Sequence, residues 1–204
     1  MASLPIHAPS FGDTVPLEPS AETLAFLARR RSASALALAP PGPTPGELET
    51  LLTIAARAPD HGKLAPWRFV ILRGAAKAAF VAALEAIAGR RPDSAKAVTK
   101  LGKIRRPPVT VAVVSRPATG EIPEWEQQLS AGAVCFLLAA GAQAMGYGAN
   151  WITDWYAYDP DAAALLGLTG DERVAGFIQL GTATEVPLER VRPDLRALVS
   201  DWEP

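Results

Sequence analysis

The run Val109-Thr-Val-Ala-Val-Val114 is continuous, apolar and rich in β-branched residues. Such a run predicts a strand that is buried on both faces of a sheet. Two further apolar runs, residues 69–72 and 174–180, predict additional strands. The chain must therefore build a sheet around these strands and cover it with other elements.

Five segments have the apolar spacing that is typical of amphipathic helices. They are residues 20–31, 47–57, 75–88, 125–145 and 161–166. The longest is rich in glycine and alanine, and such small residues allow close approach of another helix or of a flat ligand. The helices do not alternate strictly with the strands, so we expect an α+β fold, with one sheet and helices packed on it, rather than a doubly wound sheet.

The two ends of the chain lack this periodicity. Residues 1–19 are rich in proline, and residues 184–204 are mostly polar. We therefore expect a single domain over residues 1–204 with an N-terminal arm (1–19) and a C-terminal arm (184–204). Arms that lack a core of their own often pack on a partner subunit, which favours a homodimer.

The composition excludes several classes of partner. The formal net charge is −1, which gives no general attraction to nucleic acid or membranes. No apolar run reaches the length of a membrane span, and the N-terminus does not resemble a secretory signal. Cys135 is the only cysteine, so no internal disulfide can form, which fits a reducing compartment such as the cytoplasm.

A polar loop lies between the second predicted helix and the first predicted strand. It reads Arg57-Ala-Pro-Asp-His-Gly-Lys-Leu-Ala-Pro-Trp-Arg-Phe69, and we call it the central loop. Its prolines exclude a helix interior, and a polar loop held between core elements is well placed to carry function. Taken alone, His61 is as consistent with a cap or a surface hydrogen bond, and Trp67 with a core anchor.

The motifs of several enzyme classes are missing. The sequence contains no GxSxG, HExxH, Walker or dinucleotide-binding glycine motif. With two histidines and one thiol, we expect no metal site. Cys135 lies between Val134 and Phe136 in the middle of a predicted helix, so we expect a buried, inert thiol, although its spacing leaves open a dyad with His61.

Cationic side chains gather in three places. They are residues 29–32 at the end of the first helix, the central loop with Arg57, His61 and Lys63, and the pair Arg190 and Arg192 in the C-terminal arm. Guanidinium groups and a serine hydroxyl suit a phosphate, which they bind through charge-assisted hydrogen bonds. Any one arginine could be a solvated surface charge, but the first and central clusters together, with the small-residue helix nearby, favour an anionic cofactor.

The motifs Arg29-Arg-Arg-Ser-Ala-Ser34, Arg57-Ala-Pro-Asp-His61 and Pro66-Trp-Arg-Phe69 resemble those of the nitroreductase family of FMN-dependent oxidoreductases, closest to its small NAD(P)H nitroreductase-like subgroup. Further matches are Trp125-Glu-Gln, Ser130-Ala-Gly132 and Gly146-Tyr-Gly-Ala-Asn-Trp151. The resemblance covers roughly residues 23–181. It implies an α+β sandwich with a central mixed or antiparallel sheet and a homodimer that binds FMN at the subunit interface.

The resemblance also implies roles for individual residues. Arg30, Arg31 and Ser32 are expected to contact the phosphate and the pyrimidine side of FMN, and Arg57 and His61 are further expected cofactor contacts. Trp151, Ile152 and Thr153 lie where the family lines the isoalloxazine ring. Arg190 and Arg192 are expected to reach the phosphate. Lys63 or Arg57 is expected to place a cation beside the flavin. The segment from Gly141 to Gly146 aligns with one that is assigned to nicotinamide nucleotide.

The activity implied is ping-pong hydride transfer, in which NADH or NADPH reduces FMN and a nitroaromatic, quinone or related small acceptor is then reduced. No protein group is expected to act as a nucleophile. Two departures from the family pattern are Ala65, where many members have a hydrogen-bonding side chain, and Ser34, where many have lysine. Alternatives are flavin fragmentation or dehalogenation on the same fold, and a non-catalytic nucleotide- or flavin-binding protein.

Overall fold

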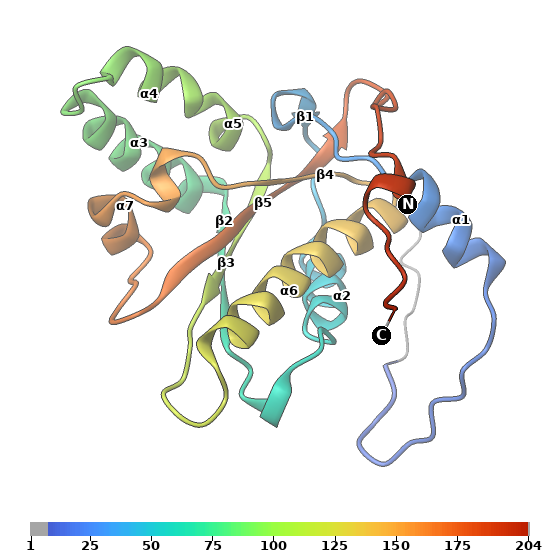
Figure 1. Ribbon diagram of the computed structural model, residues 1–204. Coiled ribbons are helices and arrows are strands. Elements are labelled where there is room, and N and C mark those ends of the chain that lie inside the picture. The colour runs from blue at the N-terminus through green and yellow to red at the C-terminus, as the bar shows by residue number, and fades with distance from the viewer. Residues whose placement is uncertain (1–7, 204) are drawn as a thin grey trace.

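The computed structural model describes residues 8–203 and contains one five-stranded sheet (Figure 1). The strands are β1 (Leu38–Ala39), β2 (Trp67–Arg73), β3 (Val109–Ser115), β4 (Gly148–Ile152) and β5 (Arg173–Ala183). Strand β5 is the hub, because it pairs with β1, β3 and β4, while β2 pairs with β3. Every one of these pairings is antiparallel, which decides between the mixed and antiparallel sheets left open by the sequence.

Strand β3 is buried at every position, as its continuous apolar run predicts. Its side chains alternate between two hydrophobic clusters on the two faces of the sheet. Val109, Val111 and Val113 point to one cluster, and Ala112 belongs to the other. A strand of this kind needs helices on both faces to exclude water from it.

Seven α-helices lie in the described part of the chain. They are α1 (Ala21–Arg29), α2 (Pro45–Ala55), α3 (Gly74–Gly89), α4 (Ser94–Lys100), α5 (Gly102–Arg105), α6 (Glu124–Ala144) and α7 (Pro160–Leu165). Helices α2 and α6 cover one face of the sheet, and α3, α4, α5 and α7 cover the other (Figure 1). The start of α2 is fixed by a capping box, in which Thr44 and Glu47 satisfy each other's backbone N–H groups.

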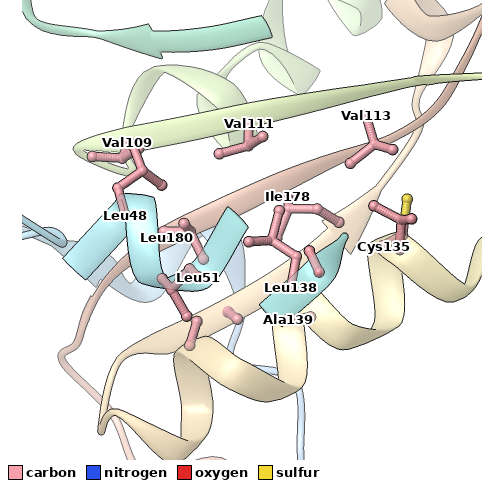
Figure 2. Packing of buried hydrophobic residues seen from close by; sticks show 14 of the residues in the cluster. Leu48, Leu51, Val109, Val111, Val113, Cys135, Leu138, Ala139, Ile178 and Leu180 are labelled. Atoms are coloured by element: carbon pink, nitrogen blue, oxygen red, sulfur yellow. The ribbon is translucent and has the colours of Figure 1, made fainter. Parts of the chain in front are cut away.

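The core beneath α6 fixes the position of this long helix (Figure 2). Cys135 and Leu138 of α6 face Ile178 of β5, and Leu51 of α2 completes the layer. All four side chains are fully buried. Truncating one such leucine or isoleucine to alanine typically costs about 2–5 kcal/mol, so α6 is held rigidly along its whole buried face.

The structure departs from the sequence-based predictions at three points. The first helix ends at Arg29 instead of Arg31, and its expected apolar stripe is not buried in this chain, since Leu24 is 69% exposed. Strand β4 was not predicted, because its residues do not alternate between apolar and polar. Its pairing with β5 holds this segment extended. Strand β1 has only two residues and lies in a segment that was expected to be a loop.

Both predicted arms are largely irregular where they are described. Residues 8–19 contain no helix or strand, and the segment after β5 holds only a single 3-10 turn, Leu195–Ala197. Residues 1–7 of the predicted N-terminal arm lie outside the described part. Among residues 8–203, no helix has both the length and the apolarity to cross a membrane.

Candidate functional site

The segment of residues 30–34 leaves α1 and runs beside β4; we call it the strap. Its backbone is fixed by the Ala33 N–H, which donates to the carbonyl of Ala149 at 3.1 Å, and by the Asn150 side chain, which donates to the carbonyl of Ala33. Gln143 of α6 donates to the carbonyl of Arg31 at 2.7 Å. The strap therefore holds Arg30, Arg31 and Ser32 at the C-terminal end of α6.

The C-terminal arm returns to the same place. Arg31 Nε donates to the carbonyl of Leu188 at 2.8 Å, and Arg192 donates to the carbonyl of Arg30 at 3.5 Å. The structure therefore brings Arg192 of the predicted arm pair to the strap arginines, although they are about 160 residues apart in the sequence. The other member, Arg190, makes only a local contact, in which its backbone N–H donates to Glu189 at 2.7 Å.

Glu189 is a carboxylate inside this cationic cluster. Its Oε1 lies 2.9 Å from Arg192 and 3.7 Å from Arg31. The hydrogen bond from the Arg190 N–H, together with the charges of Arg192 and Arg31, lowers the pKa of Glu189. The arginines are thus arranged around one anionic group of the chain itself, and a phosphate carries the same type of acceptor oxygen.

A pocket of about 470 Å³ opens at this cluster. Its lining combines cations, small residues and one amide; it includes Arg29, Arg30, Arg31, Gln143, Gly146 and Gly148. The Oε1 atom of Gln143 is buried and has no hydrogen-bond partner among the described residues. The pocket can therefore receive an anion at the arginines and a hydroxyl or N–H donor at the amide oxygen.

Strand β4 leads from this pocket to Trp151. Gly148 and Trp151 are three residues apart, which is about 10 Å along a strand. The Trp151 indole lies across Gly176 of β5 and donates to the carbonyl of Ala175 at 3.1 Å, and its far edge comes close to Gly132 of α6. Trp151 also lines a second pocket of about 270 Å³ that includes Ser115 and Arg173. Ile152 and Thr153 follow it and are partly buried.

The central loop lies at the other end of α6, and its backbone is strained. Gly62, Lys63 and Ala65 all have positive φ values, of 76°, 56° and 45°, and the last two are not glycines. The carboxylate of Asp60 accepts from the Ala65 N–H at 2.8 Å, and Trp67 is buried in the core, as expected of an anchor. The side chain of Lys63 is exposed.

Within one chain, His61 contacts α6 at the end opposite to the strap backbone. His61 Nδ1 lies 2.7 Å from Glu126 Oε2, at the N-terminal end of α6, and exposed Arg57 lines a separate pocket of about 310 Å³ beside α2. Glu126 and Gln143 are seventeen residues apart, which is about 25 Å along the axis of a helix. His61 and the strap backbone therefore lie at opposite ends of α6. Other contacts of the two segments lie closer together, because the Arg30 guanidinium is 5.6 Å from the ring centroid of Phe136 and the Ser130 hydroxyl donates to the carbonyl of Pro59.

Comparison with known proteins identifies the family of this chain. The model of the nitroreductase family matches residues 27–182. The chain is 33% identical over 163 residues to the Escherichia coli K12 protein named "Putative NAD(P)H nitroreductase YdjA", and the match covers 79% of this chain and 88% of that protein. The chain belongs to the nitroreductase family. A Haemophilus influenzae protein of the same description is 29% identical over 167 residues, covering 80% and 90% of the two chains.

Solved structures show the same fold. A nitroreductase-like protein from Bacillus cereus superimposes with a TM-score of 0.80 at 20% identity, covering 93% of this chain and all of that one. A nitroreductase from Bacteroides fragilis, solved with bound FMN, gives a TM-score of 0.69 at 19% identity, covering 90% and 100%. These findings confirm the family recognised from the motifs and the α+β fold expected from it.

The two glycines of the predicted nicotinamide segment have different surroundings in this chain. A Cβ added at Gly141 would lie 3.2 Å from Leu51 of α2, so the small size of Gly141 is explained by helix packing. Gly146 has a φ of 87°, ends α6 and lines the strap pocket. Of the predicted nicotinamide segment, Gly146 therefore faces the pocket, whereas Gly141 packs against α2.

Cys135 is fully buried, as expected, and burial raises the pKa of its thiol to about 12, which disfavours the reactive thiolate. The thiol is nine residues beyond Glu126 on α6 and faces the core, whereas His61 is bonded to Glu126 at the surface, so no Cys135–His61 dyad forms. Among residues 8–203, no group of three or more histidine, cysteine, aspartate or glutamate side chains is arranged to hold a metal.

Three residues of the site were not predicted: Gln143, Asn150 and Glu189. Gln143 is the only amide in the small-residue stretch of residues 138–146, a signal that was available in the sequence. Asn150 stands inside the Gly146–Trp151 family motif without an assigned role. Glu189 directly precedes Arg190, but nothing in the sequence shows that it contacts Arg31 of the strap.

Proposed function

We propose that the protein is an FMN-dependent NAD(P)H oxidoreductase that reduces small acceptors such as nitroaromatics or quinones. The observation that carries this proposal is the cationic strap pocket at the C-terminal end of α6. A second, separate pocket holds Trp151 of β4. Family membership supports it, as do the names of the Escherichia coli and Haemophilus influenzae relatives and the FMN bound in the Bacteroides fragilis nitroreductase.

The residues of the strap pocket fit FMN. Arg30, Arg31 and Arg192 present guanidinium groups that suit a phosphate, and the unpartnered Gln143 Oε1 suits a donor such as a ribityl hydroxyl. Further along β4, the indole of Trp151 and the small residue Gly132 offer a flat, side-chain-poor surface of the kind that an isoalloxazine ring needs. Bound FMN supplies the hydride chemistry, accepting from NAD(P)H and then donating to the acceptor.

The protein's own contribution is to bind, orient and neutralise charge. The strap and the C-terminal arm hold the phosphate end, and strand β4, fixed by its pairing with β5, holds the ring end. Lys63 or Arg57 would place a cation beside the ring, and His61 would contact it. No nucleophile is required, which agrees with the buried, protonated thiol of Cys135.

The same geometry favours a homodimer with one FMN site at each end of the interface. Within one chain, the contacts of His61 and of the strap backbone on α6 are about 25 Å apart along the helix axis, which favours a site that takes them from two subunits. A two-fold axis across α6 would place the central loop of one subunit beside the strap of the other. Apolar side chains that are exposed in the single chain, including Leu24, Leu27, Trp125 and Phe136, would then be buried.

The test is binding of FMN to the purified full-length protein, followed by absorbance and flavin fluorescence. We expect saturable binding, and anaerobic loss of flavin absorbance near 450 nm (roughly the usual flavin maximum) when NADPH or NADH is added. No binding and no oxidation of either nucleotide would overturn the proposal. The cytoplasmic location stays a prediction.

A matched pair of variants examines the phosphate contact. Arg31→Gln should weaken FMN binding by about 10- to 100-fold, which is the usual contribution of a hydrogen bond to a charged group. Riboflavin, which lacks the phosphate, should bind both forms equally. The control is Arg90→Gln, because Arg90 is exposed at the end of α3 and pairs with Asp161, away from the strap. Equal loss of riboflavin binding would contradict the assignment of Arg31.

A further inference from the structure

Lys77 is a buried lysine on the face of the sheet opposite the strap. It lies on α3, where it is only 5% exposed, and its neighbours on the same helix, Phe80, Val81 and Leu84, are buried in the second core cluster. Its Nζ donates to the carbonyl oxygen of Pro107, which precedes β3. Lysine is rarely buried to this degree without a carboxylate partner.

The surroundings of Lys77 favour the neutral amine. An ammonium group has three donors, yet Pro107 supplies the only acceptor among the described residues. The carboxylate in the same pocket belongs to Glu85, and it is already paired with Arg105. Burial lowers the pKa of Lys77 to about 7, so a large fraction of the side chain carries a free lone pair at neutral pH.

Lys77 also lines a pocket of about 390 Å³. One wall is apolar and consists of Ala78, Val81 and Ala82. The charged groups that face the pocket are Glu85 of α3, Arg105 at the end of α5 and Arg106 directly after it. Arg106 makes no ion pair among the described residues, so its guanidinium remains available to an anion.

We propose that Lys77 is a site of covalent acylation by small acyl phosphates. The neutral amine attacks the carbonyl carbon, a nitrogen–carbon bond forms, and the carbon–oxygen bond to phosphate breaks. Phosphate leaves with the bonding electrons beside Arg106, and the proton released by the amine passes to water. The product is an uncharged amide, which suits the apolar wall better than an ammonium group does. A nucleophile, an anion-binding cation and an apolar wall thus meet in one pocket.

The test uses the folded, full-length protein and acetyl phosphate as the probe. Site-specific acetylation rates are measured by peptide mass spectrometry between pH 6 and 9. The internal control is Lys96, which is exposed on α4 and shares the same reaction mixture. We expect Lys77 to react at least several-fold faster than Lys96 at pH 7, and its rate to level off above about pH 7. A lysine with the ordinary pKa of about 10.4 would instead gain about tenfold per pH unit over this range.

Two further measurements test whether the reactivity of Lys77 depends on the folded pocket and on Arg106. In denaturant, the advantage of Lys77 over Lys96 should disappear, because it depends on the folded pocket. Arg106→Gln should slow acetylation of Lys77 by acetyl phosphate while leaving its reaction with the uncharged reagent N-acetylimidazole unchanged. A Lys77 rate at or below that of Lys96, a rate that rises tenfold per pH unit, or an unchanged rate in Arg106→Gln would overturn the proposal. None of these outcomes depends on flavin binding.

Discussion

The positions of the strap and the central loop predict that one intact site requires two copies of the chain. We define a strap variant, Arg30→Gln with Arg31→Gln, and a loop variant, Arg57→Gln with His61→Gln. In a homodimer of either variant, both sites carry a damaged component. In a mixed dimer, one site combines both damaged segments, while the other receives its strap and its central loop undamaged.

The size of the effect follows from the geometry of α6. Within one chain, the contacts of His61 and of the strap backbone on this helix are about 25 Å apart, so in the proposed homodimer we expect each site to take them from different subunits. A mixed dimer then has one intact site of two. It should bind about one FMN per dimer, compared with about two for the wild type and almost none for either variant alone.

The assay uses co-expression of the two variants with different affinity tags, followed by tandem purification of the mixed dimer. Bound FMN is measured by absorbance, and NADPH oxidation per dimer should recover to about half of the wild-type rate. The control is a mixed dimer of the strap variant with a chain that carries all four changes, which has no intact site. If the chains do not copurify, or if the mixed dimer binds no more FMN than its parents, the shared site is wrong.

Three smaller predictions concern single residues. Gly176→Ala should lower the free energy of unfolding in urea by about 2–4 kcal/mol, because a Cβ there would overlap the indole of Trp151, whereas Gly120→Ala, with no atom near its Cβ, should change it little. The twofold contact of Arg68 with Glu172 lowers the pKa of Glu172 to about 2, below the ordinary value of about 4.3. The unfolded chain therefore binds this proton more readily than the folded chain does. The ion pair contributes about 3 kcal/mol to the free energy of unfolding above about pH 4.3, and this contribution should be lost as the pH falls towards 2. Urea titrations at each pH should show this loss in the wild type but not in Glu172→Gln. Glu189→Gln should tighten binding of FMN about three- to tenfold in fluorescence titrations, because it removes the carboxylate that occupies the strap arginines; equal or weaker binding would contradict that role, and Glu185→Gln serves as the control.

The elements that could be predicted from the sequence are those with a strong local pattern. The β-branched run of β3, the capping box of Thr44 and Glu47, and the apolar spacing of α3 each determine their own structure with little help from the rest of the chain. Strand β4 could not be predicted, because its residues Gly148-Ala-Asn-Trp-Ile152 have no alternation and become a strand only when β5 supplies the hydrogen bonds.

The sequence predicted which residue types belong to the candidate site but not where they lie along α6. The motifs predict that Arg31 and His61 both contact the cofactor, yet their spacing in the sequence does not show that the strap backbone and His61 contact opposite ends of this helix. The apolar spacing of α1 predicts a buried face, but no residue of this helix is buried in the single chain. Periodicity indicates that a face is apolar and does not indicate which chain covers it. In the proposed homodimer, the partner subunit covers Leu24.

The strain in the central loop gives an independent reason to assign that loop to a ligand. A non-glycine residue in the left-handed region costs about 1–2 kcal/mol, and Lys63 and Ala65 both lie there. The cost is offset by contacts that fix the loop on either side, namely the Asp60 carboxylate on the Ala65 N–H and the burial of Trp67. Backbone strain that is held in place by its surroundings collects at binding sites, where it orients side chains before the ligand arrives. Ala65, which cannot offer a hydrogen bond from its side chain, therefore contributes its conformation. In the proposed homodimer, we expect this conformation to present exposed Lys63 to the cofactor at the interface.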